Sequence, residues 1–299
     1  MFFIANHPIY NHPLPEGHRF PMLKYELLPK QLLHEGTAEC TDFYSPDSID
    51  LSLVHAVHTV SYVKALTELT LDAKAVRSIG FPLSAALVER ELRIAQGTVV
   101  GCNHALENGI AFNIAGGTHH AFSDRGEAFC LLNDQAIATQ YLINQKKCHK
   151  ILIVDLDVHQ GNGTAEIFQN NADVITFSMH GQSNYPFRKE TSDYDIALPD
   201  KTDDTTYLSI LQETLPELLN IHRPDFVFYL AGVDILGTDK LGKLGCTLEG
   251  CKTRDSYVLG LCKSLGIPVQ VSMGGGYSPA IKTIIEAHAN TYRVARALY

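Results

Sequence analysis

The sequence predicts a single α/β domain with a doubly wound, mostly parallel sheet flanked by helices. Short apolar runs at 151–154, 226–231 and 268–272 are typical of strands buried on both faces. Segments with helical periodicity separate these runs, and this alternation is the pattern of a parallel sheet. The chain of 299 residues is 45% hydrophobic, shows neither an internal repeat nor a linker, and can bury one large core. We therefore expect one domain over residues 1–299.

The first half of the chain supplies a short strand at 2–5, a proline- and histidine-rich loop at 7–21, and then mostly helix. In that loop we expect His7, His12 and His18 to lie at the surface. Apolar periodicity predicts helices at 22–33, 53–71 and 84–108, the last ending near Gly109. His55 and His58, in the second of these helices, are interpreted as packing residues. A strand is expected at 110–115.

The second half alternates more regularly. After a helix at 133–145 and the strand at 151–154, we expect a short helix at 164–170 and a strand at 174–178. A helix at 205–221 leads to the strand at 226–231, and a helix at 253–265 leads to the strand at 268–272. The closing helix extends to Leu298, and Ser278 is predicted to cap its start.

Composition excludes several classes of protein. No stretch approaches the roughly 20 apolar residues of a membrane span, and the N-terminus lacks the basic region of a signal peptide. The seven cysteines are odd in number and form no Cys-x-x-Cys pair, which argues against a disulfide framework or a zinc finger. A net charge of −9 disfavours direct binding of nucleic acid. We expect a soluble, cytoplasmic protein.

The chain is organised around residues 151–164, where four aliphatic residues run into Asp155, Asp157 and His159. Alternate side chains of an extended segment share a face, so these three polar groups point the same way where the strand ends. Two buried carboxylates beside an imidazole are costly without a compensating cation or hydrogen bonds. A divalent metal is the simplest compensation.

Polar groups also follow three other predicted strands. His119 and His120 come after a Gly-Gly turn, Asp234 follows the strand at 226–231, and Tyr277 follows three glycines after the last strand. Open α/β sheets bind their ligands at the carboxyl ends of strands. Each of these polar clusters is therefore expected at the end of a strand where such a sheet binds ligands, although Tyr277 taken alone is equally typical of a core tyrosine.

Four segments resemble signatures of the histone deacetylase family. They are Gly-Gly-Thr-His-His-Ala at 116–121, Asp-Leu-Asp-Val-His-Gln-Gly-Asn-Gly at 155–163, Ala-Gly-Val-Asp at 231–234 and Gly-Gly-Gly-Tyr at 274–277. The resemblance extends from about Leu51 to the C-terminus. Gln160, Asn162 and the segment Ser-Asp-Arg-Gly at 123–126 are most similar to the class IV branch and its bacterial relatives.

The resemblance implies the arginase–deacetylase fold with one catalytic zinc ion held by Asp157, His159 and Asp234. Three protein ligands with an open position are the general pattern of catalytic zinc. Zinc would polarise an amide carbonyl and acidify a water, one of His119 and His120 would take the proton, and Tyr277 would donate to the oxyanion.

Further roles follow from the same resemblance. Asp155 would hold one imidazole, His119, and raise its basicity. Many family members outside this branch carry Asp where this chain has Asn162; a neutral partner should leave His120 with a lower pKa. A structural K⁺ or Na⁺ ion is implied at the backbone of five residues: Asp155, Asp157, His159, Ser178 and Met179.

The implied substrate is an acyl group on a lysine side chain, acetyl or longer, since class IV resemblance also allows long-chain acyl groups. Phe129 and Tyr185 would form opposite walls of an acyl-lysine tunnel, and Gly275 would complete the substrate site. An aromatic slot suits an alkyl chain that ends in a neutral amide. Ala128 departs from the glycine common in the family and is expected to reshape the tunnel.

Alternatives from other classes are weaker. A two-metal ureohydrolase on the same fold would need more strand-end aspartates than this chain supplies, and a silent binding module would lack a ligand or Tyr277. Acetylpolyamines and other small N-acyl amines present the same alkyl amide, so the catalytic residues leave the substrate open. The oligomeric state and the choice between zinc and iron are also open.

Overall fold

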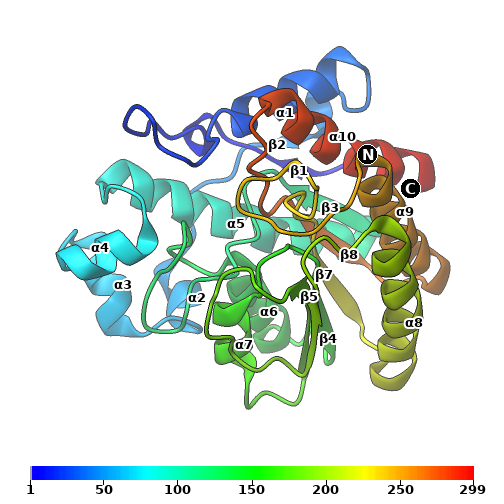
Figure 1. Cartoon of the computed structure of the whole chain (residues 1–299). Coiled ribbons are helices and arrows are strands. Elements are labelled where there is room, and N and C mark those ends of the chain that lie inside the picture. Colours follow the sequence, from blue (N-terminus) through cyan, green and yellow to red (C-terminus); the bar gives the residue numbers. More distant parts are fainter. Residues whose placement is uncertain (1) are drawn as a thin grey trace.

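The computed structural model describes residues 2–299 and contains one parallel sheet (Figure 1). Within these residues the sheet has eight strands in the order β2-β1-β3-β8-β7-β4-β5-β6, and every neighbouring pair is parallel. The strands are β1 (Ile4–Ala5), β2 (Phe43–Tyr44), β3 (Ile110–Asn113), β4 (Ile151–Asp155), β5 (Val174–Gly181), β6 (Tyr194–Leu198), β7 (Phe226–Leu230) and β8 (Val269–Ser272).

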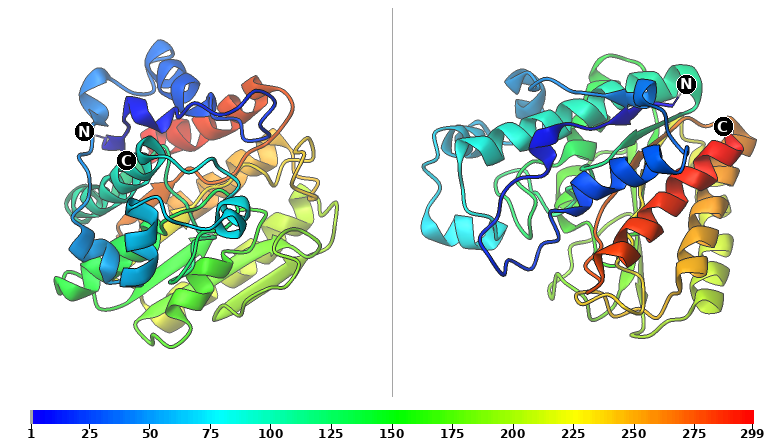
Figure 2. Two further views of the ribbon diagram at one scale, coloured as in Figure 1. Left: turned by 90° about the vertical axis from the view of Figure 1, so that its left-hand side faces the viewer. Right: turned by 90° about the horizontal axis from the view of Figure 1, so that it is seen from above.

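Helices cover both faces of this sheet, as in a doubly wound fold (Figure 2). The N-terminal helix α1 (blue) lies beside the C-terminal helix α10 (red), and Arg293 of α10 pairs with Glu35 at 2.6 Å. The helices are α1 (Lys24–His34), α2 (Leu51–His55), α3 (Val60–Thr67), α4 (Ala73–Ile79), α5 (Ala85–Asn108), α6 (Asp134–Asn144), α7 (Asn162–Phe168), α8 (Asp204–His222), α9 (Leu248–Leu265) and α10 (Ile281–Leu298).

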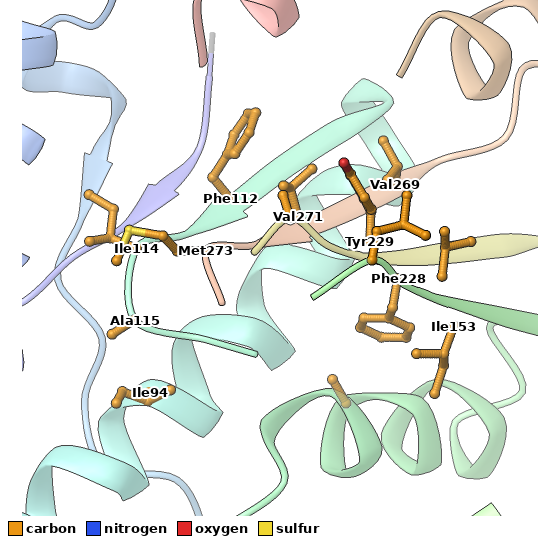
Figure 3. Packing of buried hydrophobic residues seen from close by; sticks show 14 of the residues in the cluster. Ile94, Phe112, Ile114, Ala115, Ile153, Phe228, Tyr229, Val269, Val271 and Met273 are labelled. Carbon is orange, nitrogen blue, oxygen red and sulfur yellow. The ribbon is translucent and has the colours of Figure 1, made fainter. Parts of the chain in front are cut away.

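Side chains of the central strands alternate between two apolar layers. In Figure 3, Phe228 and Ile153 point to one face of the sheet, and Tyr229, next to Phe228 in the same strand, points to the other. Phe112 of β3 stacks on Tyr292 of α10 with ring centroids 4.4 Å apart. Because the central strands are buried on both faces, their sequences are apolar without alternation.

The predicted fold class and most predicted elements are confirmed. Ser84 caps α5 by accepting a hydrogen bond from the Leu87 amide, and Gly109 ends that helix in a left-handed conformation. The edge strands β2 and β6 were not predicted. Strand β2 has only two residues, and β6 is half exposed, so neither has the apolar run that marks the central strands.

The single helix predicted at 53–71 is wrong. The chain instead forms α2 and α3, because the Thr59 side chain accepts a hydrogen bond from the Tyr62 amide and starts a second helix. The Thr59 amide donates to the Ser123 carbonyl at 2.8 Å. Apolar periodicity continues through the break and therefore did not reveal it. The following helix α4 was also not predicted.

The loop histidines are less exposed than predicted. His12 is buried, and His18 is half-buried with Nε2 2.9 Å from the Gly80 carbonyl. The predicted cap of the closing helix is also wrong: α10 begins after Ala280, and the Ser278 hydroxyl lies 2.9 Å from that of Thr238.

Two expectations from composition can be compared with the structure. All seven cysteines are free thiols. Among the described residues, no helix is both long and apolar enough to cross a membrane.

Candidate active site

The order of the strands brings the conspicuous motifs to one edge of the sheet. Strand β7 lies between β8 and β4, and Leu230 is in register with both Asp155 of β4 and Ser272 of β8. The segments that follow these three strands carry Asp157, His159, Asp234 and Tyr277. They therefore leave the sheet at the same height, as the sequence analysis predicted.

Asp157, His159 and Asp234 form a compact buried cluster whose potential ligand atoms all lie within 4.8 Å of one another. Nδ1 of His159 is 3.0 Å from Oδ1 of Asp157 and 3.2 Å from Oδ2 of Asp234. The cluster joins the turn after β4 to the turn after β7, although the two aspartates are far apart in sequence.

Main-chain amides orient both carboxylates. Asp157 accepts from the amides of His159 and Gly275, at 3.0 and 2.7 Å, and Oδ1 of Asp234 accepts from the Val158 amide at 3.0 Å. Oδ2 of Asp234 is buried and, although Nδ1 of His159 lies 3.2 Å away, accepts no well-formed hydrogen bond from any residue that the structure describes. An unpaired buried carboxylate oxygen is costly, and a divalent cation would compensate it. The residues thus fit a metal ion.

The charges in the cluster support the same conclusion. Burial raises the pKa of Asp234 to about 7, and the neighbouring Asp157 carboxylate adds to the effect. Burial lowers the pKa of His159, but the two neighbouring carboxylates outweigh it and raise the value to about 10. A proton is thus retained among three groups that a divalent cation would bind in its place.

The two adjacent histidines have different partners. Nδ1 of His119 lies 2.7 Å from Oδ2 of Asp155, and Nδ1 of His120 lies 2.6 Å from Oδ1 of Asn162. Both predicted contacts are confirmed. The imidazole rings lie side by side, with centroids 4.1 Å apart.

The partners give the two histidines opposite pKa shifts. Burial lowers the pKa of His119, but the Asp155 carboxylate more than offsets this and raises it. Burial holds the pKa of His120 well below its usual value, and nearby His119 and His159 lower it further. His119 is therefore the more readily charged ring, and His120 stays neutral.

Close approach of α7 to the histidine pair requires a glycine. A Cβ atom on Gly163 would overlap the carbonyl of Ala121. The Thr164 amide donates to the His119 carbonyl at 3.2 Å, which fixes the start of the helix beneath the pair. Close packing against the Ala121 carbonyl thus explains why glycine follows Asn162 in the sequence motif.

Tyr277 lies beside His159 of the cluster. Its ring centroid is 6.3 Å from that of His159, and its amide donates to Oδ2 of Asp239 at 2.6 Å. Burial and the nearby Asp157 and Asp234 carboxylates hold the pKa of the Tyr277 hydroxyl well above its usual value. The hydroxyl is therefore protonated at neutral pH and can donate a hydrogen bond.

A cavity of about 400 Å³ leads to this cluster and is lined by Phe129, Tyr185, His120, His159 and Tyr277. The Tyr185 ring packs edge-on against His120 at 5.0 Å, and its hydroxyl donates to Glu127 at 2.5 Å. The Phe129 ring is 6.2 Å from that of Tyr277. The two aromatic residues predicted for the tunnel therefore both lie in its lining.

The loop that carries Phe129 has an unusual backbone. Ala128 and Phe129 have positive φ angles of 44° and 70°, and their amides donate to the carbonyls of Ser78 and Ile79. A left-handed conformation costs a residue with a side chain roughly 1–2 kcal/mol, which explains why glycine is suited to position 128. Ala128 lines the cavity without displacing Phe129 from it.

Gly275, predicted to contact substrate, lies against the carboxylates. Its amide donates to Asp157 and its carbonyl accepts from the Val233 amide at 2.9 Å, so both main-chain groups have partners within the protein. A Cβ atom there would overlap the Asp157 and Asp234 carboxylates. Gly275 therefore contributes to the site by allowing the main chain to lie close to the two carboxylates.

Two charged residues beside the site were not predicted. Lys24 of α1 is fully buried and donates to the Gly274 carbonyl at 3.0 Å, with its ammonium 5.7 Å from the Tyr277 ring centroid. Arg90 of α5 lines a small inner cavity of about 40 Å³ beside His119 and Gly275. Both residues lie in helices, where a charged residue is normally expected at the surface. They are also far in sequence from the motifs, so the sequence did not identify them as neighbours of the site.

The proposed monovalent-cation residues lie together at the ends of two strands. Asp155 of β4 is in register with Ser178 of β5, and Met179 follows on the same strand. The Gly181 amide donates to the Val158 carbonyl at 2.9 Å, which joins β5 to the turn containing Asp157 and His159. Cation binding by these five residues stays a prediction.

An all-parallel α/β sheet with a buried Asp-His-Asp cluster beside two histidines is suited to metal-dependent hydrolysis. Residues 18–292 match the family model described as the histone deacetylase domain, so the chain belongs to the histone deacetylase family.

Sequence relatives agree with this membership. The chain is 46% identical over 298 residues to an uncharacterized protein of Picosynechococcus sp., covering 100% of this chain and 99% of that protein. It is 28% identical over 279 residues to Histone deacetylase 2 of Arabidopsis thaliana, covering 90% of this chain and 72% of the relative.

Two solved structures share the fold. The histone deacetylase homologue from Aquifex aeolicus superposes with a TM-score of 0.84 at 22% identity, covering 98% of this chain and 83% of its own. A histone deacetylase homologue in complex with SAHA gives a TM-score of 0.85 at 21% identity, covering 100% of this chain and 84% of its own.

Proposed function

We propose that this protein is a zinc-dependent deacylase that hydrolyses acyl-lysine side chains, with acetyl or longer acyl groups. The observation that carries the proposal is that the Asp-His-Asp cluster, the unequal histidine pair and Tyr277 converge beside one aromatic cavity. A relative named as a histone deacetylase and a homologue solved with SAHA support this chemistry.

Asp157, His159 and Asp234 would hold the zinc ion. When bound, zinc supplies a Lewis acid for the amide carbonyl and lowers the pKa of a water. Two carboxylates and one imidazole are acceptable zinc donors, and the unpaired oxygen of Asp234 would gain a partner.

The remaining polar residues would move or hold protons. His120 is neutral, with Nδ1 directed to Asn162, so its Nε2 would accept the proton of the attacking water. His119, favoured in its charged form by Asp155, would supply the proton that the leaving lysine amine needs. The Tyr277 hydroxyl would donate to the developing oxyanion.

The cavity also bears on the choice of substrate. Apart from histidines and tyrosines, the ionisable side chains in its described lining are Arg19 and Lys243, both cationic. Glu127, reached through the Tyr185 hydroxyl, is already paired with Arg125 at 3.0 Å. Cations in the lining repel a polycation, which favours acyl-lysine over acetylpolyamines.

A substrate panel tests the proposal. Zinc-loaded protein would be assayed with acetyl-lysine peptides, long-chain acyl-lysine peptides and acetylpolyamines, with Asp234→Ala as the control for contaminating activity. We expect hydrolysis of at least one acyl-lysine peptide and much slower hydrolysis of acetylpolyamines. Faster turnover of acetylpolyamines would select the alternative substrate class, and no hydrolysis by fully zinc-loaded protein would refute the proposal.

The proposal treats residues 1–299 as one catalytic domain. It includes a structural K⁺ or Na⁺ ion at Asp155, Asp157, His159, Ser178 and Met179. Dialysis against a buffer without K⁺ or Na⁺ should then lower the melting temperature.

A further inference from the structure

Arg254 of α9 is a fully buried arginine that reaches the turns carrying two of the proposed metal ligands. Its Nη1 donates to the Gly232 carbonyl at 2.6 Å and to the Leu156 carbonyl at 3.2 Å. Leu156 directly precedes Asp157, and Gly232 lies two residues before Asp234. One nitrogen therefore bridges the two turns that carry Asp157 and Asp234.

A second set of bonds holds the guanidinium in place. Nε of Arg254 donates to Oδ1 of Asp255 at 2.9 Å, and Nη2 lies 2.8 Å from the same oxygen. Asp255 also accepts from the Tyr229 hydroxyl of β7 at 2.5 Å and from the Thr291 hydroxyl of α10 at 2.7 Å. The arginine is thus attached to α9, α10 and the sheet at once.

A contribution to stability alone does not explain why this buried network is present. A buried ion pair contributes little net stability, because desolvating the two charges offsets most of their attraction. Arg254 donates to two carbonyls that lie just beyond the ends of β4 and β7, where the chain leaves the sheet. A planar guanidinium holds its acceptors at set positions, which a flexible ammonium does not.

We propose that Arg254 is a positioning residue for the metal centre. By bridging the Leu156 and Gly232 carbonyls, it sets the orientation of those two peptides and hence the separation of the Asp157 and Asp234 carboxylates. The inference rests on the proposed function, because it takes these carboxylates as metal ligands. Groups behind metal ligands that orient them typically affect metal affinity or activity 10–100-fold.

The test is Arg254→Lys, which keeps the positive charge but removes the planar array of donors. The metal-free protein would be titrated with Zn²⁺ against a chromophoric chelator, and the absorption spectrum of its Co²⁺ form would be recorded. We expect Zn²⁺ affinity to fall by roughly 10–100-fold and the Co²⁺ bands to shift, since both report on ligand geometry. Unchanged affinity and an unchanged spectrum would overturn the inference.

Arg93→Lys is a matched control. Arg93 of α5 also joins a carboxylate on its own helix, Glu89 at 2.5 Å, and a main-chain carbonyl, that of Pro46 at 2.8 Å. It contacts neither strand-end turn. We expect this variant to lose a similar type of bonding while Zn²⁺ affinity and the Co²⁺ spectrum stay as in the wild type. An equal loss in both variants would show that Arg254 acts only through general stability.

Two further measurements separate the possible failures. If the wild-type protein binds no Zn²⁺, or Asp234→Ala binds it as tightly, the proposed function fails before Arg254 is in question. If Arg254→Lys does not fold, Tyr229→Phe removes one bond to Asp255 and should weaken Zn²⁺ binding by a few-fold with a smaller shift of the Co²⁺ bands. No change in that variant would also overturn the inference.

Discussion

The floor and the wall of the site are held in different ways. The floor, which comprises Asp157, His159 and Asp234, follows two neighbouring strands and is held by main-chain amides. The wall, which comprises Phe129 and Tyr185, belongs to loops held by other loops and by α4. This difference between floor and wall indicates that the sheet fixes the positions of the polar groups. The shape of the cavity depends instead on loop contacts that can vary separately.

The sharpest test of the floor is Asp234→Ala. Two remaining protein ligands should hold zinc poorly, so we expect loss of the metal and a decrease in activity of more than about 1000-fold. Metal analysis of the purified variant, together with its turnover, checks this. Full zinc occupancy with normal turnover would remove Asp234 from the metal site.

Tyr277→Phe tests the catalytic step separately from metal binding by the floor residues. The ring remains but the hydroxyl that would donate to the oxyanion is lost, so kcat should fall by roughly 100-fold while zinc stays bound. The matching measurement is kcat at full zinc occupancy. A decrease of less than about threefold would return Tyr277 to a packing role.

The wall depends on a histidine that sequence analysis interpreted as packing. Nδ1 of His58 lies 2.9 Å from the Phe122 carbonyl, and Nε2 accepts from the Asn133 amide at 3.0 Å. These two residues bracket the loop that carries Phe129. A neutral ring can make both bonds, but a charged ring cannot accept the second.

We therefore expect acid to remove the stability that His58 contributes to the loop of Phe129. Burial lowers the pKa of His58 from 6.5 to about 4, so below pH 6.5 the unfolded chain binds a proton that the folded protein does not. The stability from neutral His58 is present above pH 6.5 and is lost as the pH falls toward 4, by about 2 kcal/mol between pH 7 and 5.

Urea unfolding of His58→Gln over this pH range provides the measurement. The variant should lose that part of the pH dependence, whereas His55→Gln, at an exposed position at the end of α2, should keep it. An identical pH dependence in wild type and His58→Gln would contradict this account of the wall.

The smallest expected effect concerns the histidine pair between floor and wall. Asn162→Asp would place a carboxylate where Oδ1 now lies 2.6 Å from Nδ1 of His120, which favours the charged ring and raises its pKa. If His120 is the base, the acidic limb of the kcat/KM profile should move to higher pH by about one unit. An unmoved limb in fully zinc-loaded variant protein would exclude His120 as the base.

Sequence reasoning predicted the floor better than the surroundings. Asp155, Asp157 and His159 follow an apolar run, and the register of a strand determines which side chains share a face. The contacts of His119 with Asp155 and of His120 with Asn162 were also predicted, from motifs. By contrast, the break at Thr59 lies within continuous apolar periodicity, and the edge strand β6 lacks an apolar run.

The sequence by itself determined the parallel α/β class and the residues of the floor, because apolar runs and the polar groups after them are local patterns. Only the tertiary structure decided which distant groups surround them. Lys24 at the Gly274 carbonyl, Arg254 at the Gly232 carbonyl and His58 at the Phe122 carbonyl act through contacts between segments far apart in the chain. Such contacts follow from the packing of whole elements, and no local pattern specifies them.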